Sequence, residues 1–169
     1  TGMGAGVILN GRLYEGASGD AGEVGHLRLA PDGPVGFGKA GSFEGFCSGG
    51  GIALQARARA AEWLRQGRQP AFCPSAADLP QVTAETVARA AQDGDPLALE
   101  VFAGVARQLG RGLALLVDIL NPQRIIIGSI YSRQRALLEP LALQTLREEA
   151  LPLALSVCTI VPAELGENI

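Results

Sequence analysis

Residues 95–129 read DPLALEVFAGVARQLGRGLALLVDILNPQRIIIGS, and this stretch decides the fold class. Asp95-Pro96 is a helix start, with Asp as N-cap and Pro at the first helical position, and Asn121-Pro122 is a stop. Apolar residues between them recur at helical spacing: Leu97, Val101, Phe102, Val105, Leu109, Leu113, Leu116 and Leu120. Residues 124–128 are apolar and β-branched, which predicts a buried strand of a mostly parallel sheet. A long helix followed by such a strand predicts an α/β fold with crossover helices.

Further strands are expected on both sides of this stretch. Residues 7–14 alternate around Asn10-Gly11, a pair that accepts the positive φ values of a type I′ turn, so a β-hairpin is predicted. A short strand is expected at residues 26–30 and a last one at residues 156–161.

Three further helices are predicted. One follows Ser48 and runs to about Gln66, a second is N-capped by Thr83 and ends near Gln92, and a third covers about residues 133–150. Loops with many Gly or Pro residues are predicted at residues 16–25, 31–47 and 67–80.

Composition and charge disfavour several classes of function. The net charge is −3 and there is one histidine, so nothing favours nucleic acid or an anionic membrane as a partner. The apolar runs are interrupted by polar residues or glycine, so no transmembrane span is expected. Three cysteines without a C-x-x-C pair, and no signal peptide, indicate the cytoplasm. The chain starts at Thr1 without a Met, and we expect it to be part of a longer protein.

Glycine-rich segments hold the first candidate binding residues. The glycines of Thr1-Gly2-Met3-Gly4-Ala5-Gly6 let backbone N–H groups approach an anion, as in a phosphate-binding loop, although an edge strand without a ligand is the alternative. Gly22-Glu23-Val24-Gly25-His26 combines a carboxylate with an imidazole, and both groups can hydrogen-bond sugar hydroxyls. The alternative there is a surface Glu and a core His satisfied by backbone groups.

Two other segments offer contacts to a ligand. Glu44 lies between Phe43 and Phe46, whose rings suit the apolar face of a sugar, with plain core packing as the alternative. Gly128 and Ser129 follow the predicted strand, where small residues let a flat base lie against the backbone. Simple strand termination is the alternative for that pair.

These motifs, in their order along the chain, resemble the ROK family of sugar kinases and sugar-sensing repressors. The order is T-G-x-G-A-G, G-E-x-G-H, G-x-x-E-x-x-x-S-G, N-P-x-x-I-I-I-G and Leu165-Gly166-Glu167-Asn168. The resemblance implies a ribonuclease H-like (actin-like ATPase) fold of two lobes, with residues 1–169 as the C-terminal lobe, a mixed sheet and flanking helices. It also implies ATP and Mg²⁺ as cofactors, a hexose as substrate, and a homodimer, as in many members.

The resemblance assigns roles to single residues. It implies that Glu23, His26 and Glu44 bind sugar hydroxyls. It implies phosphate or nucleotide contacts by Thr1, Gly2, Gly4, Gly128 and Ser129. The family more often has glycine where Ser129 stands. No segment matches the family's first phosphate loop or its general-base Asp, so no catalytic residue is expected in this chain.

The zinc motif of the family is lost in this sequence. Its three cysteines fall at Val35, Phe37 and Ser42. A structural zinc needs four N or S ligands, and only His26, with Cys47 nearby, remains. No zinc is therefore expected, and Val35 and Phe37 are expected to fill the space by apolar packing.

The leading hypothesis is a glucokinase-like enzyme that transfers the γ-phosphoryl group of MgATP to a hexose, with the base supplied from outside this chain. The rival is the sugar-sensing domain of a ROK-type repressor. A third reading is an interaction domain whose pocket has decayed. The glycines retained in residues 1–6 favour the kinase. Glucose, N-acetylglucosamine, mannose and fructose all present hydroxyls that the three polar residues accept.

Overall fold

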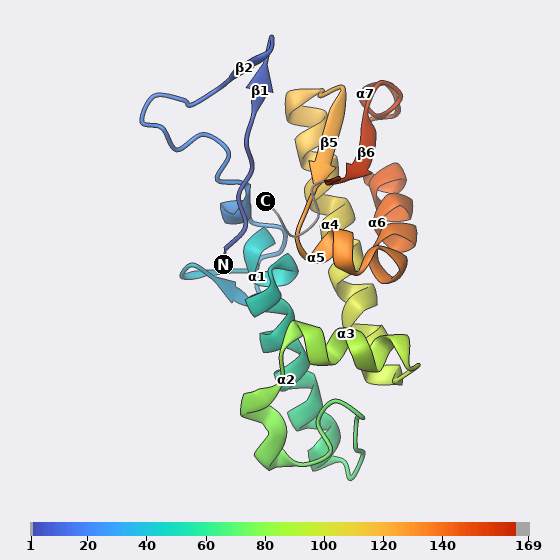
Figure 1. Cartoon of the computed structure of the whole chain (residues 1–169). Helices are drawn as coiled ribbons and strands as arrows, with labels where there is room; N and C mark the ends of the chain where they lie inside the picture. Colours follow the sequence, from blue (N-terminus) through green and yellow to red (C-terminus); the bar gives the residue numbers. More distant parts are fainter. Residues whose placement is uncertain (1, 165–169) are drawn as a thin grey trace.

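One long helix organises the chain. The computed structural model describes residues 2–164 and places helix α4 (Pro96–Leu120) at the centre, with other helices packed along it (Figure 1). Its partners include α1 (Phe43–Cys47), α2 (Gly49–Arg65), α3 (Ala84–Gln92) and α6 (Arg135–Glu149), and the contact with α6 is the most extensive.

The predicted ends of α4 are confirmed. The Asp95 carboxylate accepts a hydrogen bond from the backbone N–H of Ala98 at 2.8 Å, as an N-cap does. Its other oxygen accepts from the N–H of Ala71 at 2.7 Å, which ties the loop after α2 to the helix start. At the other end Asn121 adopts the left-handed conformation that closes many helices.

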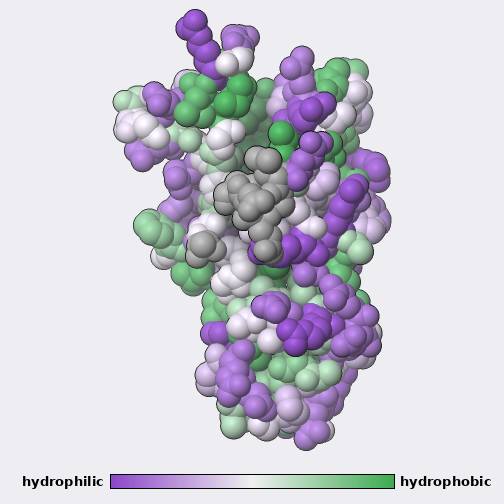
Figure 2. All heavy atoms as spheres, viewed as in Figure 1, coloured by the Kyte–Doolittle hydropathy of each residue, from purple (hydrophilic) through white to green (hydrophobic). Residues whose placement is uncertain are grey.

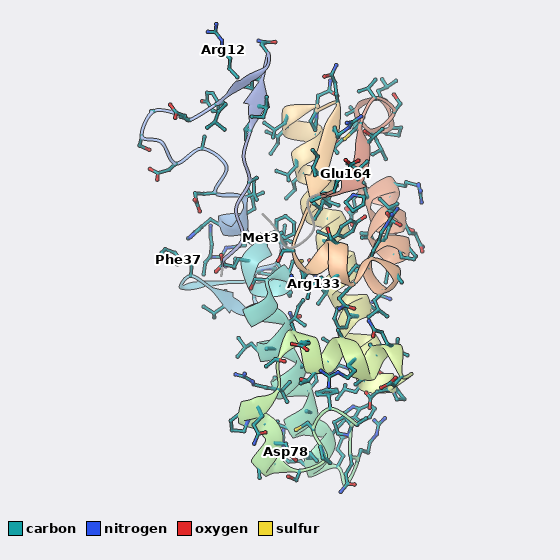
Figure 3. The ribbon with its side chains drawn as sticks, viewed as in Figure 1. Met3, Arg12, Phe37, Asp78, Arg133 and Glu164 are labelled. Carbon is teal, nitrogen blue, oxygen red and sulfur yellow. The ribbon has the colours of Figure 1, made fainter. Side chains whose placement is uncertain are left out.

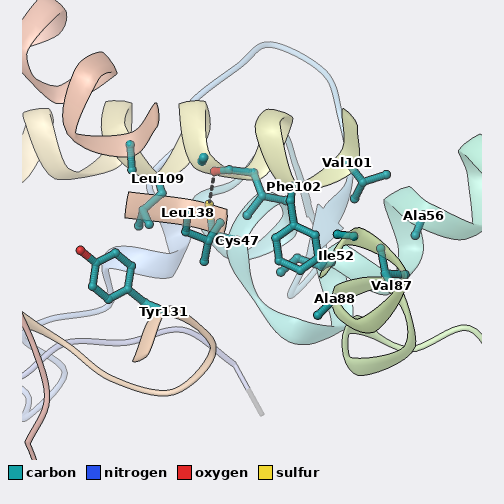
Figure 4. Close-up of a cluster of buried hydrophobic side chains, with 14 of the residues drawn as sticks. Cys47, Ile52, Ala56, Val87, Ala88, Val101, Phe102, Leu109, Tyr131 and Leu138 are labelled. Carbon is teal, nitrogen blue, oxygen red and sulfur yellow. Dashed lines mark hydrogen bonds between the residues drawn. The ribbon is translucent and has the colours of Figure 1, made fainter. Parts of the chain in front are cut away.

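The core lies on the predicted face of α4, except at its last turn. Val101, Phe102 and Leu109 are buried there together with Ile52 of α2 and Leu138 of α6 (Figure 4). Leu120, predicted on the same face, is instead 42% exposed, whereas Val117 is buried.

The helices predicted around α4 are largely confirmed. α2 follows Ser48, whose hydroxyl caps it, and α3 begins after Thr83, whose hydroxyl accepts from the N–H of Thr86. The third predicted helix corresponds to α6, and the short α5 (Ile130–Arg133), which was not predicted, precedes it. Within residues 2–164, no helix combines the length and the hydrophobicity that crossing a membrane requires.

Among the described residues, the strands form three separate two-stranded sheets. β5 (Arg124–Ile127) pairs in parallel with β6 (Thr159–Pro162), and the connection between them runs through α5, α6 and α7 (Pro152–Leu155). The parallel pairing is as predicted, but the burial of β5 is not. Ile125 and Ile127 pack on the core, whereas Ile126 points the other way and is 63% exposed. The described residues therefore leave one face of β5 exposed at Ile126.

The predicted N-terminal hairpin is confirmed. β1 (Ile8–Leu9) and β2 (Arg12–Leu13) pair antiparallel, and Asn10 and Gly11 have φ values of 52° and 75°, as a type I′ turn requires. The hairpin extends away from the helices, and its apolar side chains are exposed, so that Figure 2 shows them at the surface.

The segments between the hairpin and α1 differ from prediction. Residues 26–30 form no strand: His26 ends the 3₁₀ helix η1 (Val24–His26), and Arg28 makes only an isolated bridge with Ser42. The predicted loop 31–47 contains the hairpin of β3 (Val35–Gly36) and β4 (Lys39–Ala40) and then α1. The loop 67–80 likewise runs into a second 3₁₀ helix, η2 (Ala76–Gln81). Such short elements bury too few residues to leave a periodic pattern.

Candidate functional site

A cavity of about 430 Å³ lies where the N-terminal loop, the α1–α2 junction and the β5–α5 turn meet. Gly2 and Gly4 line it from the N-terminal loop, and Gly128 and Ser129 line it from the turn after β5. Four of the five residues predicted to contact phosphate or nucleotide therefore share one cavity. The fifth, Thr1, lies outside the described residues. Met3 and Arg133, labelled in Figure 3, are also among the lining residues.

Two glycines of the N-terminal loop have different surroundings. A Cβ on Gly2 would come within 2.7 Å of a Glu44 carboxylate oxygen, so a side chain there would require the end of the Glu44 side chain to shift. Among the described residues, a Cβ on Gly4 would meet nothing closer than the carbonyl of Gly22 at 3.9 Å, which is an ordinary contact. The fold itself thus has room for a side chain at Gly4, which is one of the residues that line the cavity.

Ser129 holds a conformation that normally takes glycine. Its φ and ψ are 55° and −126°, a combination that is strained for a residue with a Cβ. The backbone at this point therefore follows the turn expected of a glycine, although the sequence has serine. Strain of this kind is concentrated at binding sites and turns.

Tyr131 forms a buried part of the cavity wall. It is 2% exposed, and its hydroxyl donates to the Glu139 carboxylate at 3.0 Å. Burial, together with that hydrogen bond and the nearby charge of Glu139, raises the pKa of Tyr131 to about 12. Arg135 pairs with the same carboxylate at 2.8 Å. Sequence reasoning did not single out Tyr131; its place two residues after Ser129 was the only signal available.

Cys47 closes the wall from the α1–α2 junction. It is buried, and its thiol donates to the carbonyl of Val105 at 3.7 Å, the dashed line in Figure 4. Burial raises the pKa of the Cys47 thiol, which keeps it protonated. The thiol therefore serves as a packing group on the core side.

Glu44 connects the predicted sugar-binding segment to this cavity. Its carboxylate accepts a hydrogen bond from the backbone N–H of Met3 at 2.9 Å. A Cβ on Gly25 would lie 3.2 Å from the Glu44 Cβ, so α1 packs directly on the turn that carries Glu23 and His26. The backbone joins the same elements, because the N–H of Phe43 donates to the carbonyl of Leu27 at 2.8 Å.

The three predicted sugar-binding residues thus lie on two adjacent elements. Glu23 is exposed, and His26 and Glu44 are half-buried. Phe43 takes the alternative role: it is 1% exposed and fits against Gly112 of α4, so it belongs to the core. Phe46 also packs on the core while partly exposed.

The positions of the lost zinc motif are not filled as expected. Val35 is 53% exposed and Phe37 is 81% exposed, so the prediction that they pack as a small apolar core is wrong. Ser42 is fully buried and caps α1 by accepting from the N–H of Gly45 at 3.1 Å. Between residues 2 and 164, no three His, Cys, Asp or Glu side chains are grouped as ligands of a metal ion. These residues do not fit a structural zinc.

Solved structures place this architecture in a known fold class. A ROK family glucokinase from Streptomyces griseus, determined with glucose and AMPPNP, superposes with a TM-score of 0.75 at 28% identity, over 98% of this chain and 54% of that one. The chain therefore has the ribonuclease H-like (actin-like ATPase) fold, as predicted.

The sequence comparisons give the family. The chain belongs to the ROK family, whose sequence pattern matches residues 1–169. It is 33% identical over 168 residues to the DNA-binding transcriptional dual regulator NagC of Escherichia coli K12. It is also 33% identical over 171 residues to a glucokinase of Halalkalibacterium halodurans. Both alignments cover 99% of this chain but only 39% and 50% of the respective relative, so the chain spans half or less of their length.

Proposed function

We propose that this chain is the C-terminal lobe of a two-lobe hexose kinase that uses MgATP. The observation that carries the proposal is the cavity that is lined by Gly2, Gly4, Gly128 and Ser129. A hydrogen bond from the backbone N–H of Met3 to Glu44 joins this cavity to helix α1, which carries one of the proposed sugar-binding residues. In the proposed layout, the cavity of about 430 Å³ receives the phosphates and lies next to groups that suit sugar hydroxyls. The proposal places the reaction in the cytoplasm, where ATP is available.

In this proposal the chain contributes positioning. Backbone N–H groups of the N-terminal loop hold phosphate oxygens, as glycine-rich loops do. The carboxylates of Glu23 and Glu44 accept hydrogen bonds from sugar hydroxyls, and His26 donates or accepts another. Mg²⁺ would offset the charge of the phosphates, and an Asp outside this chain would take the hydroxyl proton. Phosphoryl transfer depends mainly on such positioning and on charge stabilisation.

Gly4 separates the kinase from the second candidate, a sugar-sensing repressor domain. A regulator and a glucokinase are equally similar to this chain at 33% identity, so similarity alone favours neither. Packing leaves room for a side chain at Gly4, so the fold itself does not require glycine at this position. A sensor that binds only sugar does not require glycine there either. Glycine at position 4 keeps the backbone beside the cavity accessible to an anion, and this supports a phosphate-binding role.

The test is Gly4→Ala in the longer protein, with Gly6→Ala as the matched control. Neither added Cβ comes closer than 3.9 Å to another atom of the described chain, so neither variant should lose stability through packing. Gly4→Ala should raise the dissociation constant for an ATP analogue about tenfold, because one phosphate contact is blocked. Gly6→Ala should leave it unchanged. Equal nucleotide affinity in the two variants contradicts the phosphate-binding role.

A further inference from the structure

The β3–β4 hairpin touches both elements that carry the proposed sugar-binding residues. On one side, a Cβ on Gly36 would come within 2.5 Å of the backbone nitrogen of Gly45 and 3.0 Å of the Glu44 Cβ, so β3 lies directly on α1. On the other side, the Lys39 ammonium donates to the backbone carbonyl of His26 at 2.6 Å. The hairpin therefore bridges Glu44 and His26.

The turn of this hairpin is unusual for its sequence. Two residues, Phe37 and Gly38, connect the strands with φ values of 44° and 76°, the pattern of a type I′ turn. Asn or Asp is favoured at the first position, because a residue with a bulky side chain and positive φ costs about 1–2 kcal/mol. Phe37 is also 81% exposed, so its burial returns little of this cost.

Phe37 nevertheless has one well-defined contact. Its ring meets the His26 imidazole edge to face, with 5.2 Å between the ring centres and an interplanar angle of 75°. A strained and exposed aromatic residue whose ring contact is a proposed ligand-binding histidine indicates a functional role. Figure 3 shows Phe37 at the outer tip of the hairpin, where it contributes little to the core.

We propose that Phe37 and Lys39 are positioning residues that hold His26 at a fixed place relative to Glu44, taking over the role of a metal cross-link in this segment. Phe37 restricts the rotation of the imidazole, and Lys39 fixes the backbone of His26. The inference rests on the proposed sugar-binding role of His26, but the contact itself can be tested without sugar or ATP.

The first test uses the fact that the chain has a single histidine. Its imidazole signals in the NMR spectrum of the 169-residue chain are therefore unambiguous. Phe37→Leu removes the aromatic ring current, so the His26 signals should shift, whereas Phe37→Tyr should retain their positions. Val35→Ala, on the same hairpin, is the control and should leave them unchanged. Unshifted signals in Phe37→Leu would overturn the proposal.

The second test measures sugar affinity in the longer protein. Phe37→Leu and Lys39→Met should each raise the dissociation constant for the preferred hexose about 3- to 10-fold, because the orientation of His26 is no longer fixed. Phe37→Tyr and Lys39→Arg should restore it, and the affinity for ATP should not change. Equal losses of sugar and ATP affinity, or no rescue by the conservative variants, would indicate a general structural role and reject the proposal.

The two tests separate this inference from the proposed function. Suppose that the longer protein phosphorylates no hexose, but that Phe37→Leu shifts the His26 signals and weakens sugar binding. The positioning role is then supported and the proposed kinase function is rejected. If hexose is phosphorylated and Phe37→Leu alters neither the signals nor the affinity, the kinase stands and the positioning role is wrong.

Discussion

The carboxylate of Glu44 accepts a hydrogen bond from the backbone N–H of Met3 at 2.9 Å, across 41 positions of sequence. This bond joins helix α1, next to the turn that carries His26, to the loop that lines the cavity with Gly2 and Gly4. One side chain thus links the proposed sugar side to the proposed phosphate side.

Substitution of Glu44 should therefore affect two ligands. In the longer protein, Glu44→Ala should weaken hexose binding by about 1–3 kcal/mol, the cost of unpaired polar partners. It should also weaken ATP binding, because the loop at Met3 loses its anchor. His26→Ala should weaken only hexose binding. Calorimetric titration of each variant with both ligands measures this; unchanged hexose affinity in Glu44→Ala counts against the site.

Substitution of two glycines of α4 by alanine should change the free energy of unfolding in opposite directions. A Cβ on Gly112 would lie 2.3 Å from the buried ring of Phe43, so Gly112→Ala should destabilise the chain by about 1–3 kcal/mol. A Cβ on Gly104 would have no neighbour within 4 Å in residues 2–164 outside its own helix turn, so Gly104→Ala should stabilise the helix by about 0.5–1 kcal/mol. Urea unfolding measures both. Equal effects would show that α1 does not pack closely on α4.

Ser129→Gly should be neutral or stabilise the chain by about 1 kcal/mol, since glycine adopts the positive φ of 55° without strain. Ser132→Gly is the matched control. It lies in helix α5 and loses the hydrogen bond from its hydroxyl to the carbonyl of Ile127, so it should destabilise. Thermal unfolding of both variants tests this prediction. A clear loss of stability in Ser129→Gly would contradict the claim that the backbone at Ser129 is strained.

Tyr131 should make stability depend on alkaline pH. Its pKa in the folded chain is raised to about 12 from the ordinary value of 10, so the folded state holds this proton more tightly than the unfolded state. The resulting stability is fully present below about pH 10 and is lost as the pH rises towards 12. Tyr131→Phe should remove this part of the pH dependence.

The measurement is an ultraviolet titration of tyrosinate in the native chain. The chain has two tyrosines, so the difference between the original chain and Tyr131→Phe isolates Tyr131. Ionisation near the ordinary pKa would show that this phenol is neither buried nor bonded to Glu139.

Several elements were predictable because a local residue pair determines them. Asn10-Gly11 specifies the turn of the first hairpin, and Thr83 and Asp95 specify helix starts through their capping side chains. These signals depend on neighbours within a few positions, which the sequence shows directly.

Other features depend on tertiary contacts and were missed. The exposure of Ile126 follows from the lack of a covering layer on one face of β5 among the described residues, which no residue of β5 indicates. Phe37 looks apolar and therefore buried, but its turn places it at the surface. The grouping of Gly4 with Ser129 was available only through resemblance to a family, because 125 positions separate them (129 − 4 = 125).

The most direct test of the kinase proposal is hexose-dependent formation of ADP from MgATP. We expect the longer protein that contains this chain to form ADP and a sugar phosphate with at least one of glucose, N-acetylglucosamine, mannose and fructose. Residues 1–169 alone should fold but show no turnover, because loss of a general base typically costs about 10²–10⁴ in rate and half of the positioning is missing. Robust turnover by residues 1–169 alone would contradict the two-lobe arrangement. No ADP from the longer protein with any of these sugars, together with a hexose-dependent change in its DNA binding, would contradict the kinase and establish the repressor.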